Sequence, residues 1–192
     1  MSTLDRKAET IAPTTVDSAP SRYAGRVLAI FRYVIGFVFL WAFFDKTFGW
    51  GYATPSERAW IHGGSPTKGF LSGVAVGPFQ DTFNSWAGQP WADWLFMLGL
   101  LGIGLACVAG VALWIAAASG TLMMLMMWAA EWPLAQHTSA GDPTGSVNPI
   151  VDYHIVYALA LITFAVYYAG NTWGLGKIWS RLPLVQRHGW LR

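Results

Sequence analysis

The longest uncharged segment of the chain constrains its fold more than any other feature. No charged residue occurs between Trp94 and Ala130. One membrane-crossing helix needs roughly 20 apolar residues, each adding about 1.5 Å of length, so the segment is long enough for nearly two crossings. A turn near Gly110–Leu113 would leave about 17 apolar residues on either side, close to one crossing each. The segment therefore predicts a helical hairpin that crosses a membrane and returns.

Two further apolar stretches, Val27–Phe44 and Ile155–Ala169, bring the number of expected crossings to four. Hydrophobic residues make up 54% of the chain and charged residues only 11%, whereas roughly 25% of the residues in soluble domains are charged. The sequence predicts an all-α membrane protein built as a four-transmembrane-helix bundle. Its expected spans are about residues 27–46, 92–111, 113–132 and 152–170.

Basic residues predict the orientation of the bundle. They gather before or within the first span and after the fourth: Arg6, Lys7, Arg22, Arg26, Arg32, Lys177, Arg181, Arg187 and Arg192. Because basic residues collect on the cytoplasmic side, both termini are expected inside the cell. Residues 1–26 are polar, contain prolines and lack the apolar core of a signal peptide, so we expect a disordered cytoplasmic tail there. The membrane domain then covers residues 27–180, and residues 181–192 form a basic cytoplasmic tail.

The loop Thr47–Pro90 is long for a connection between neighbouring spans. Its apolar part, Phe70–Phe79, is too short to cross a membrane and is broken by Gly73, Gly77 and Pro78. An interfacial or re-entrant segment fits such a stretch better than a span. We therefore expect a long outer loop that contains this segment.

Small residues predict how the second span packs. Gly102, Ala106 and Gly110 recur every four residues and form one stripe along the expected helix. Such stripes let helix backbones approach closely in lipid. The sequence predicts that this stripe faces a neighbouring helix.

Four carboxylates mark the ends of the apolar stretches, and in the predicted topology all four lie on the outer side. They are Asp45, Asp93, Glu131 and Asp152. Asp93 and Asp152 stand at expected helix N-termini, where the helix dipole favours a negative charge, so they can be simple helix starts. Asp45 and Glu131 stand at expected C-termini, where the dipole opposes a carboxylate. Another contact must favour these two, and for Asp45 the neighbouring Lys46 is the obvious partner.

Glu131 has no basic neighbour in sequence and is surrounded by Trp128, Trp132 and Pro133. Apolar surroundings raise the pKa of a carboxyl group, which suits a proton donor or acceptor. A solvated carboxylate at the membrane boundary is the alternative, and the sequence leaves both open.

Histidines give no signal for a metal site. His62, His137 and His154 are scattered and lack the spacing of metal or haem ligands. Asp152 and His154 are two positions apart, and such neighbours do not face each other on a helix. We therefore expect them to have different partners, and we predict no metal or haem.

Several basic side chains are candidates for binding an anion. Arg58, His62 and Lys68 surround a Gly-Gly-Ser-Pro turn, whose amides would suit a small oxyanion, although an ordinary surface loop explains them as well. Arg32 lies more than one turn inside the first span. It either reaches back to the lipid phosphates, pairs inside the bundle, or holds an anionic or quinone-like ligand.

The first span, from Phe31 to Gly49, resembles the opening helix of the DoxX family of bacterial membrane proteins. The positions that match are Arg32, Gly36, Lys46 and Gly49. Later segments resemble the DoxD-type branch, which includes the membrane subunit of thiosulfate:quinone oxidoreductase: residues 59–67, 91–101, 126–133, 148–157 and 169–175. The resemblance covers about residues 27–180. The chain departs from the family pattern by lacking a basic residue in the turn between the second and third spans.

The resemblance implies a bacterial cytoplasmic-membrane protein that passes electrons from thiosulfate to a membrane quinone and couples two thiosulfates into tetrathionate. The residues expected to attract thiosulfate are Lys46, Arg58, His62 and Lys68. Those expected to handle protons are Asp45, Glu131, Asp152 and His154. Those expected to line the quinone site are Arg32, Trp41, Trp128 and Trp132.

Two other functions stay open at this point. The chain can be a non-catalytic membrane scaffold that recruits redox or stress-response partners, or a protein that handles small solutes or lipids. We expect contact with the lipid bilayer and none with nucleic acid. The sequence leaves open a second subunit, a soluble redox partner and self-association.

Overall fold

The computed structural model describes residues 22–191. Most of the predicted tail, residues 1–26, lies outside the described residues. The first helix nevertheless begins at Arg22, five residues before the expected span. The described residues form helices and turns and no β-strand, which confirms the all-α prediction for this part of the chain.

Among residues 22–191, three helices are long and apolar enough to cross a membrane: α1 (Arg22–Phe48), α4 (Pro90–Ala109) and α5 (Leu113–Glu131). The fourth apolar helix, α6 (Tyr153–Val166), has only 14 residues. At about 1.5 Å per residue it covers about 21 Å, less than the hydrocarbon core of roughly 30 Å. The expected span 152–170 is thus helical only in part, because the backbone leaves the α-helix at Tyr167 and Tyr168 takes a left-handed φ of 48°.

The turn between α4 and α5 lies where the sequence predicts it. Gly110 adopts a left-handed φ of 71° and its N–H donates to the carbonyl of Ala106 at 2.8 Å. A Cβ at this position would lie only 2.7 Å from the Cα of Gly170. Glycine is therefore required both by the turn and by the segment that packs on it.

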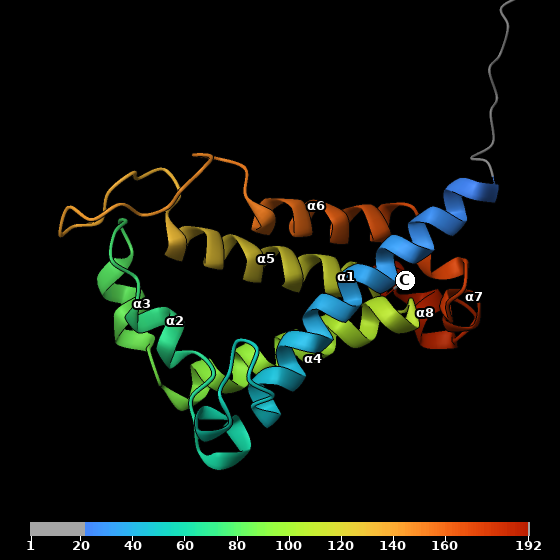
Figure 1. The fold of residues 1–192 in the computed structure, drawn as a ribbon. Coiled ribbons are helices and arrows are strands. Elements are labelled where there is room, and N and C mark those ends of the chain that lie inside the picture. The colour runs from blue at the N-terminus through green and yellow to red at the C-terminus, as the bar shows by residue number, and fades with distance from the viewer. Residues whose placement is uncertain (1–21, 192) are drawn as a thin grey trace, which may run out of the picture.

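The long helices form two packed pairs, α1 with α4 and α5 with α6, joined through the α4–α5 hairpin (Figure 1). One end of the bundle holds the end of α1, the start of α4, the end of α5 and the start of α6, together with the two long loops (Figure 1). The opposite end holds the α4–α5 turn and two short helices, α7 (Gly176–Trp179) and α8 (Pro183–Arg187). The four predicted carboxylates consequently belong to the same end of the bundle.

The outer loop carries four short helices: η1 (Ser56–Arg58), η2 (Trp60–His62), α2 (Lys68–Ser72) and α3 (Gln80–Trp86). The expected apolar segment 70–79 does not form one helix, since α2 ends at Ser72 and a turn leads into α3. Val74 and Phe83 are buried in a small cluster with Ala130 of α5. This loop therefore packs on the end of the bundle.

The C-terminal segment 181–192 is also partly folded. It contains α8, whose Val185 is 1% exposed, and η4 (Gly189–Leu191). The basic segment is thus held against the protein through an apolar side chain.

Of the predicted stripe, Gly110 packs closely, on Gly170 at the turn, but the close approach of α4 to α1 uses a different glycine, Gly104. A Cβ on Gly104 would lie 3.0 Å from the backbone nitrogen of Leu40 in α1, and Gly104 is buried. Gly102 is exposed and has no atom within 4 Å of such a Cβ. The prediction for Gly102 was wrong, because a four-residue repeat does not identify which helix face meets a neighbour.

Candidate functional site

Asp152 starts α6 by capping its first amide groups. It has an extended backbone, and its Oδ1 accepts hydrogen bonds from the N–H groups of His154 at 3.0 Å and Ile155 at 3.3 Å. This is the geometry of an N-cap aspartate. The prediction that Asp152 is a helix start is confirmed.

The other oxygen of Asp152 reaches the ring of His154. Its Oδ2 lies 2.9 Å from Nδ1 of the imidazole, and His154 is completely buried. The sequence interpretation that these residues have different partners was wrong, because it treated both as helical. Asp152 precedes the helix, and its side chain can therefore fold back over the first turn.

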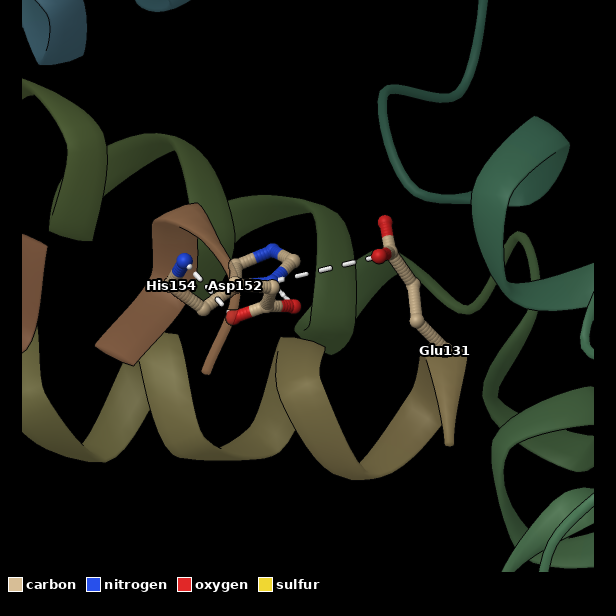
Figure 2. Close-up of side chains that lie close together, drawn as sticks. All are labelled: Glu131, Asp152 and His154. Atoms are coloured by element: carbon tan, nitrogen blue, oxygen red, sulfur yellow. Dashed lines mark hydrogen bonds and ion pairs between the residues drawn. The ribbon is translucent and has the colours of Figure 1, made fainter. Parts of the chain in front are cut away.

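Glu131 joins this pair from the last residue of α5. Its Oε2 lies 4.0 Å from Nδ1 of His154, and its Oε1 accepts a hydrogen bond from the hydroxyl of Tyr153 at 2.9 Å. Figure 2 shows the Glu131 carboxylate and the Asp152 carboxylate on the same side of the imidazole. Three of the predicted proton-handling residues thus form one cluster at the junction of α5 and α6.

Tyr153 is the member of this site that the sequence reasoning did not assign. Its hydroxyl donates the hydrogen bond to Oε1 of Glu131, while the residue is half exposed. A phenol is protonated at neutral pH and so serves as a hydrogen-bond donor there. No sequence signal pointed to it, because its contact with Glu131 depends on how the end of α5 meets the start of α6.

A pocket of about 580 Å³ opens beside the cluster. Its lining comes from α2 and the turn after it, from the end of α5, and from the loop before α6. The lining includes Phe70, Val74, Glu131, Asn148, Asp152 and Tyr153. The pocket therefore combines an apolar wall with a hydroxyl and two carboxyl groups.

Asp45 has a different environment from Glu131. It is 1% exposed, and its carboxylate accepts hydrogen bonds from the N–H groups of Tyr52 at 3.3 Å and Ala53 at 3.0 Å. These two amides are the favourable contact that Asp45 needs at a helix C-terminus, where the dipole opposes its charge. Asp45 fastens the start of the outer loop and lies outside the lining of the pocket.

Asp93 fastens the middle of the same loop. Its Oδ1 accepts bonds from the hydroxyl of Ser65 at 2.9 Å and from the hydroxyl and N–H of Thr67 at 2.6 and 2.9 Å. The dipole of α4 favours this charge, as the sequence indicated, but the N-cap of α4 is Gln89. Asp93 is therefore mainly a buried loop anchor.

Arg32 lies at the opposite end of the bundle from the pocket. It is completely buried, and its guanidinium donates to the carbonyls of Cys107, Val108 at 2.9 Å and Trp173 at 3.0 Å. These carbonyls belong to the last turn of α4 and to the segment after α6. Of the three readings of Arg32, the structure shows pairing inside the bundle.

The expected thiosulfate-binding residues belong to the outer loop and to α1. Arg58, His62 and Lys68 are exposed, and Nδ1 of His62 lies 2.7 Å from the carbonyl of Ser56. Lys46 is partly buried, with its Nζ 5.9 Å from the ring of Phe96. None of the four lines the pocket beside Glu131.

The three tryptophans expected to line the quinone site lie in two separate places. Trp128 and Trp132 flank Glu131, with ring centroids 5.8 Å apart, and Nε1 of Trp128 donates to the carbonyl of Ile150 at 2.9 Å. Trp41 instead packs against Trp50 and Tyr52 at the end of α1. Two of the three tryptophans are thus near Glu131 along the chain, and none of the three is among the residues that line the pocket.

Comparisons of the chain with protein-family models, with curated proteins and with solved structures give no match.

Proposed function

We propose that this protein is a membrane redox subunit that passes electrons from thiosulfate to a membrane quinone, and that the quinone ring binds in the pocket beside Glu131. The observation that carries the proposal is the hydrogen bond of 2.9 Å between Tyr153 and Glu131 at the pocket wall. Behind it lies the pair formed by His154 and Asp152. Together they supply proton donors and acceptors next to an apolar cavity.

Quinone reduction needs this combination of groups. A quinone takes up two electrons and two protons to become a quinol. Two thiosulfate ions supply the two electrons as a new S–S bond joins them into tetrathionate. The Tyr153 hydroxyl turns from Glu131 to donate a hydrogen bond to one quinone carbonyl, and the protonated carboxyl group of Glu131 delivers one proton to the developing quinolate. Water that reaches the pocket beside Asp152, which also lines it, supplies the second proton.

The size and the lining of the pocket support a ring-shaped substrate. Its volume of about 580 Å³ falls within the range of roughly 300–1,000 Å³ found for small-molecule sites. Phe70 and Val74 form apolar walls, and Trp128 and Trp132 lie next to Glu131 along the chain. In this proposal the isoprenoid tail extends into the surrounding lipid.

Thiosulfate would first meet the exposed basic side chains of the outer loop. Arg58, His62 and Lys68 lie on this loop, on the same end of the bundle as the pocket. The positive charges of Arg58 and Lys68 raise the local concentration of a dianion. They act in this proposal by attraction, and the electron transfer itself takes place at the quinone.

The proposal includes a fourth crossing, made by α6 and the turn after it. Asp152 and His154, at the start of α6, lie beside Glu131 at the end of α5. Leu175, beyond the end of α6, donates its N–H to the carbonyl of Ala109 at 2.8 Å, at the end of α4. The segment 152–175 therefore runs the length of the α4–α5 hairpin, which supports a four-span bundle with both termini in the cytoplasm.

The test uses the purified full-length protein in lipid nanodiscs with a short-chain quinone. Quinone absorbance and tetrathionate are followed with thiosulfate, with sulfite and without donor. We expect thiosulfate-dependent reduction in the wild type and a rate at least about 100-fold lower in Glu131→Gln, because a general acid contributes roughly 10²–10⁴-fold. Asp142→Asn, an exposed carboxylate of the loop between α5 and α6, is the matched control and should leave the rate unchanged.

Each outcome has a separate meaning. Absence of thiosulfate-dependent reduction by the wild type would contradict the proposed activity and favour the scaffold function. Undiminished reduction by Glu131→Gln would remove the proton-donor role of this residue while leaving the activity.

A further inference from the structure

Three side chains from two helices direct their donor atoms to one point at the edge of the pocket. They are Glu131 from α5 and Asp152 and His154 from the start of α6 (Figure 2). One oxygen of each carboxylate and one ring nitrogen lie within 4.8 Å of one another. Sequence spacing does not reveal this grouping, because it depends on the contact between two helix ends.

The charges of the cluster are not balanced by protein cations. Among residues 22–191, the only ion pairs of Glu131 and Asp152 within 4.0 Å are those with His154. No lysine or arginine pairs with them there. A neutral imidazole between two carboxylates leaves two negative charges, which a divalent cation would balance.

We propose that Glu131, Asp152 and His154 bind one divalent transition-metal ion of the Zn²⁺ class. Zn²⁺ binds imidazole nitrogen and carboxylate oxygen, and sites with three protein ligands leave a fourth position for water. Hard cations such as Mg²⁺ and Ca²⁺ prefer oxygen alone. The fully buried imidazole therefore favours a transition metal over these ions.

The distances need only a small adjustment. With metal–ligand bonds of about 2.1 Å, two donors on a tetrahedral ion lie about 3.4 Å apart. Nδ1 of His154 is now 2.9 Å from Asp152 and 4.0 Å from Glu131. The first pair has to open slightly and the second to close slightly. Glu131 can make most of the movement, because its side chain is 38% exposed and ends its helix.

Two features of the surroundings prepare the site for an ion. The N–H groups of His154 and Ile155 hold Oδ1 of Asp152, which orients Oδ2 towards the imidazole. Such supporting hydrogen bonds position metal ligands in proteins. Nε2 of His154 is buried and makes no hydrogen bond to protein in the described chain. When the imidazole proton moves to Nε2, Nδ1 gives up its hydrogen bond to Asp152, and Nδ1 and Oδ2 of Asp152 both become free to bind the ion.

The pocket provides access and space for the remaining ligands. It is lined by Glu131 and Asp152, so water can complete the coordination from that side. An ion held here would occupy the carboxylate that the proposed function uses as a proton donor. The site itself does not rest on that function, since its binding is measured without quinone or thiosulfate.

The experiment titrates Zn²⁺ into the chelator-treated, full-length protein in detergent, purified without a histidine tag. We expect one Zn²⁺ per chain by calorimetry, and a visible absorption band when Co²⁺ is used in its place. Glu131→Gln and Asp152→Asn should each weaken Zn²⁺ binding more than about 10-fold, since even indirect ligand contacts contribute 10–100-fold. Asn also caps helices well, so Asp152→Asn keeps the start of α6.

Asp142→Asn is again the control and should bind Zn²⁺ as the wild type does. The proposal is overturned if the wild type shows no one-to-one binding. It is also overturned if Glu131→Gln and Asp152→Asn both bind with the affinity of the control. Zn²⁺ binding without quinone reduction would support the metal site and contradict only the proposed function. Quinone reduction without Zn²⁺ binding would contradict only the metal site.

Discussion

At the scale of single residues, a charge inside the bundle is explained by the backbone groups that it meets. Arg32 is completely buried, and its partners are carbonyl groups at the end of α4 and in the segment after α6. The last carbonyls of a helix lack partners within the helix, and a cation there is also favoured by the dipole. Arg32 thus joins α1, α4 and the C-terminal segment at one point.

Replacing Arg32 by Ala should destabilise the protein by about 3 kcal/mol, because a hydrogen bond to a charged group contributes about 1.5–3 kcal/mol and several are lost together. Thermal unfolding of the detergent-solubilised protein measures the effect. Arg26→Ala removes an exposed arginine from the same helix and should change the midpoint little. Equal unfolding midpoints for the two variants would contradict the role of Arg32 in joining α1, α4 and the C-terminal segment.

The sequence could predict part of this residue-level detail. The dipole argument correctly indicated that Asp45 needs another favourable contact, and it correctly identified Asp152 as a helix start. It named Lys46 as the partner of Asp45 and missed the hydrogen bonds from the N–H groups of Tyr52 and Ala53, because these amides reach Asp45 only through the fold of the outer loop. For the same reason the contact of Glu131 with His154 was not predictable, since it links two helices.

At the scale of elements, the outer loop is held by two buried carboxylates that belong to different helices. Asp45 of α1 binds its beginning and Asp93 of α4 binds residues 65–67.

We expect Asp93→Ala to free residues 65–67, since a backbone amide and two hydroxyls lose their acceptor. Trypsin should then cut after Arg58 or Lys68 several times faster than in the wild type. Asp142→Asn supplies the control, and an unchanged cleavage rate in Asp93→Ala would contradict the anchor role.

The packing of α1 on α4 gives a second test at this scale. Gly104→Ala should lower stability by about 1–3 kcal/mol, the usual cost of overpacking, because the new methyl group would meet the backbone of Leu40. Gly102→Ala adds the same group on the same helix where nothing lies within 4 Å. The difference between their unfolding midpoints measures the contact. If Gly102→Ala destabilised the protein more than Gly104→Ala does, the stripe predicted from sequence would be the packed face of α4.

Helix positions were largely predictable because long apolar runs and turn glycines act locally. The length of the uncharged segment predicts the α4–α5 hairpin, and its glycine predicts the turn at Gly110. The short helices of the outer loop do not, because their stability comes from contacts such as Val74 and Phe83 against Ala130. The early end of α6 was also missed, since Tyr167 and Tyr168 continue the apolar pattern while the backbone turns.

At the scale of the whole molecule, the number of crossings decides on which side of the membrane each end of the bundle lies. In the described part of the chain, three helices are long enough to cross by themselves, and three crossings would put the two ends of this part on opposite sides. The fourth crossing proposed for α6 and the turn after it puts them on the same side. The side of residues 176–191 relative to the loop before α6 therefore distinguishes the two topologies.

Cysteine labelling can make this distinction, because the chain has a single cysteine, the buried Cys107. In a Cys107→Ala background, cysteines are introduced at Asp142, in the loop before α6, and at Lys177, in α7. Intact cells are treated with a maleimide that does not cross membranes. We expect labelling at 142 and none at 177 until the membrane is permeabilised, since basic residues are concentrated around the second position. Labelling of both sites in intact cells would show that α6 does not cross, and the pocket and the C-terminal helices would then face the same compartment.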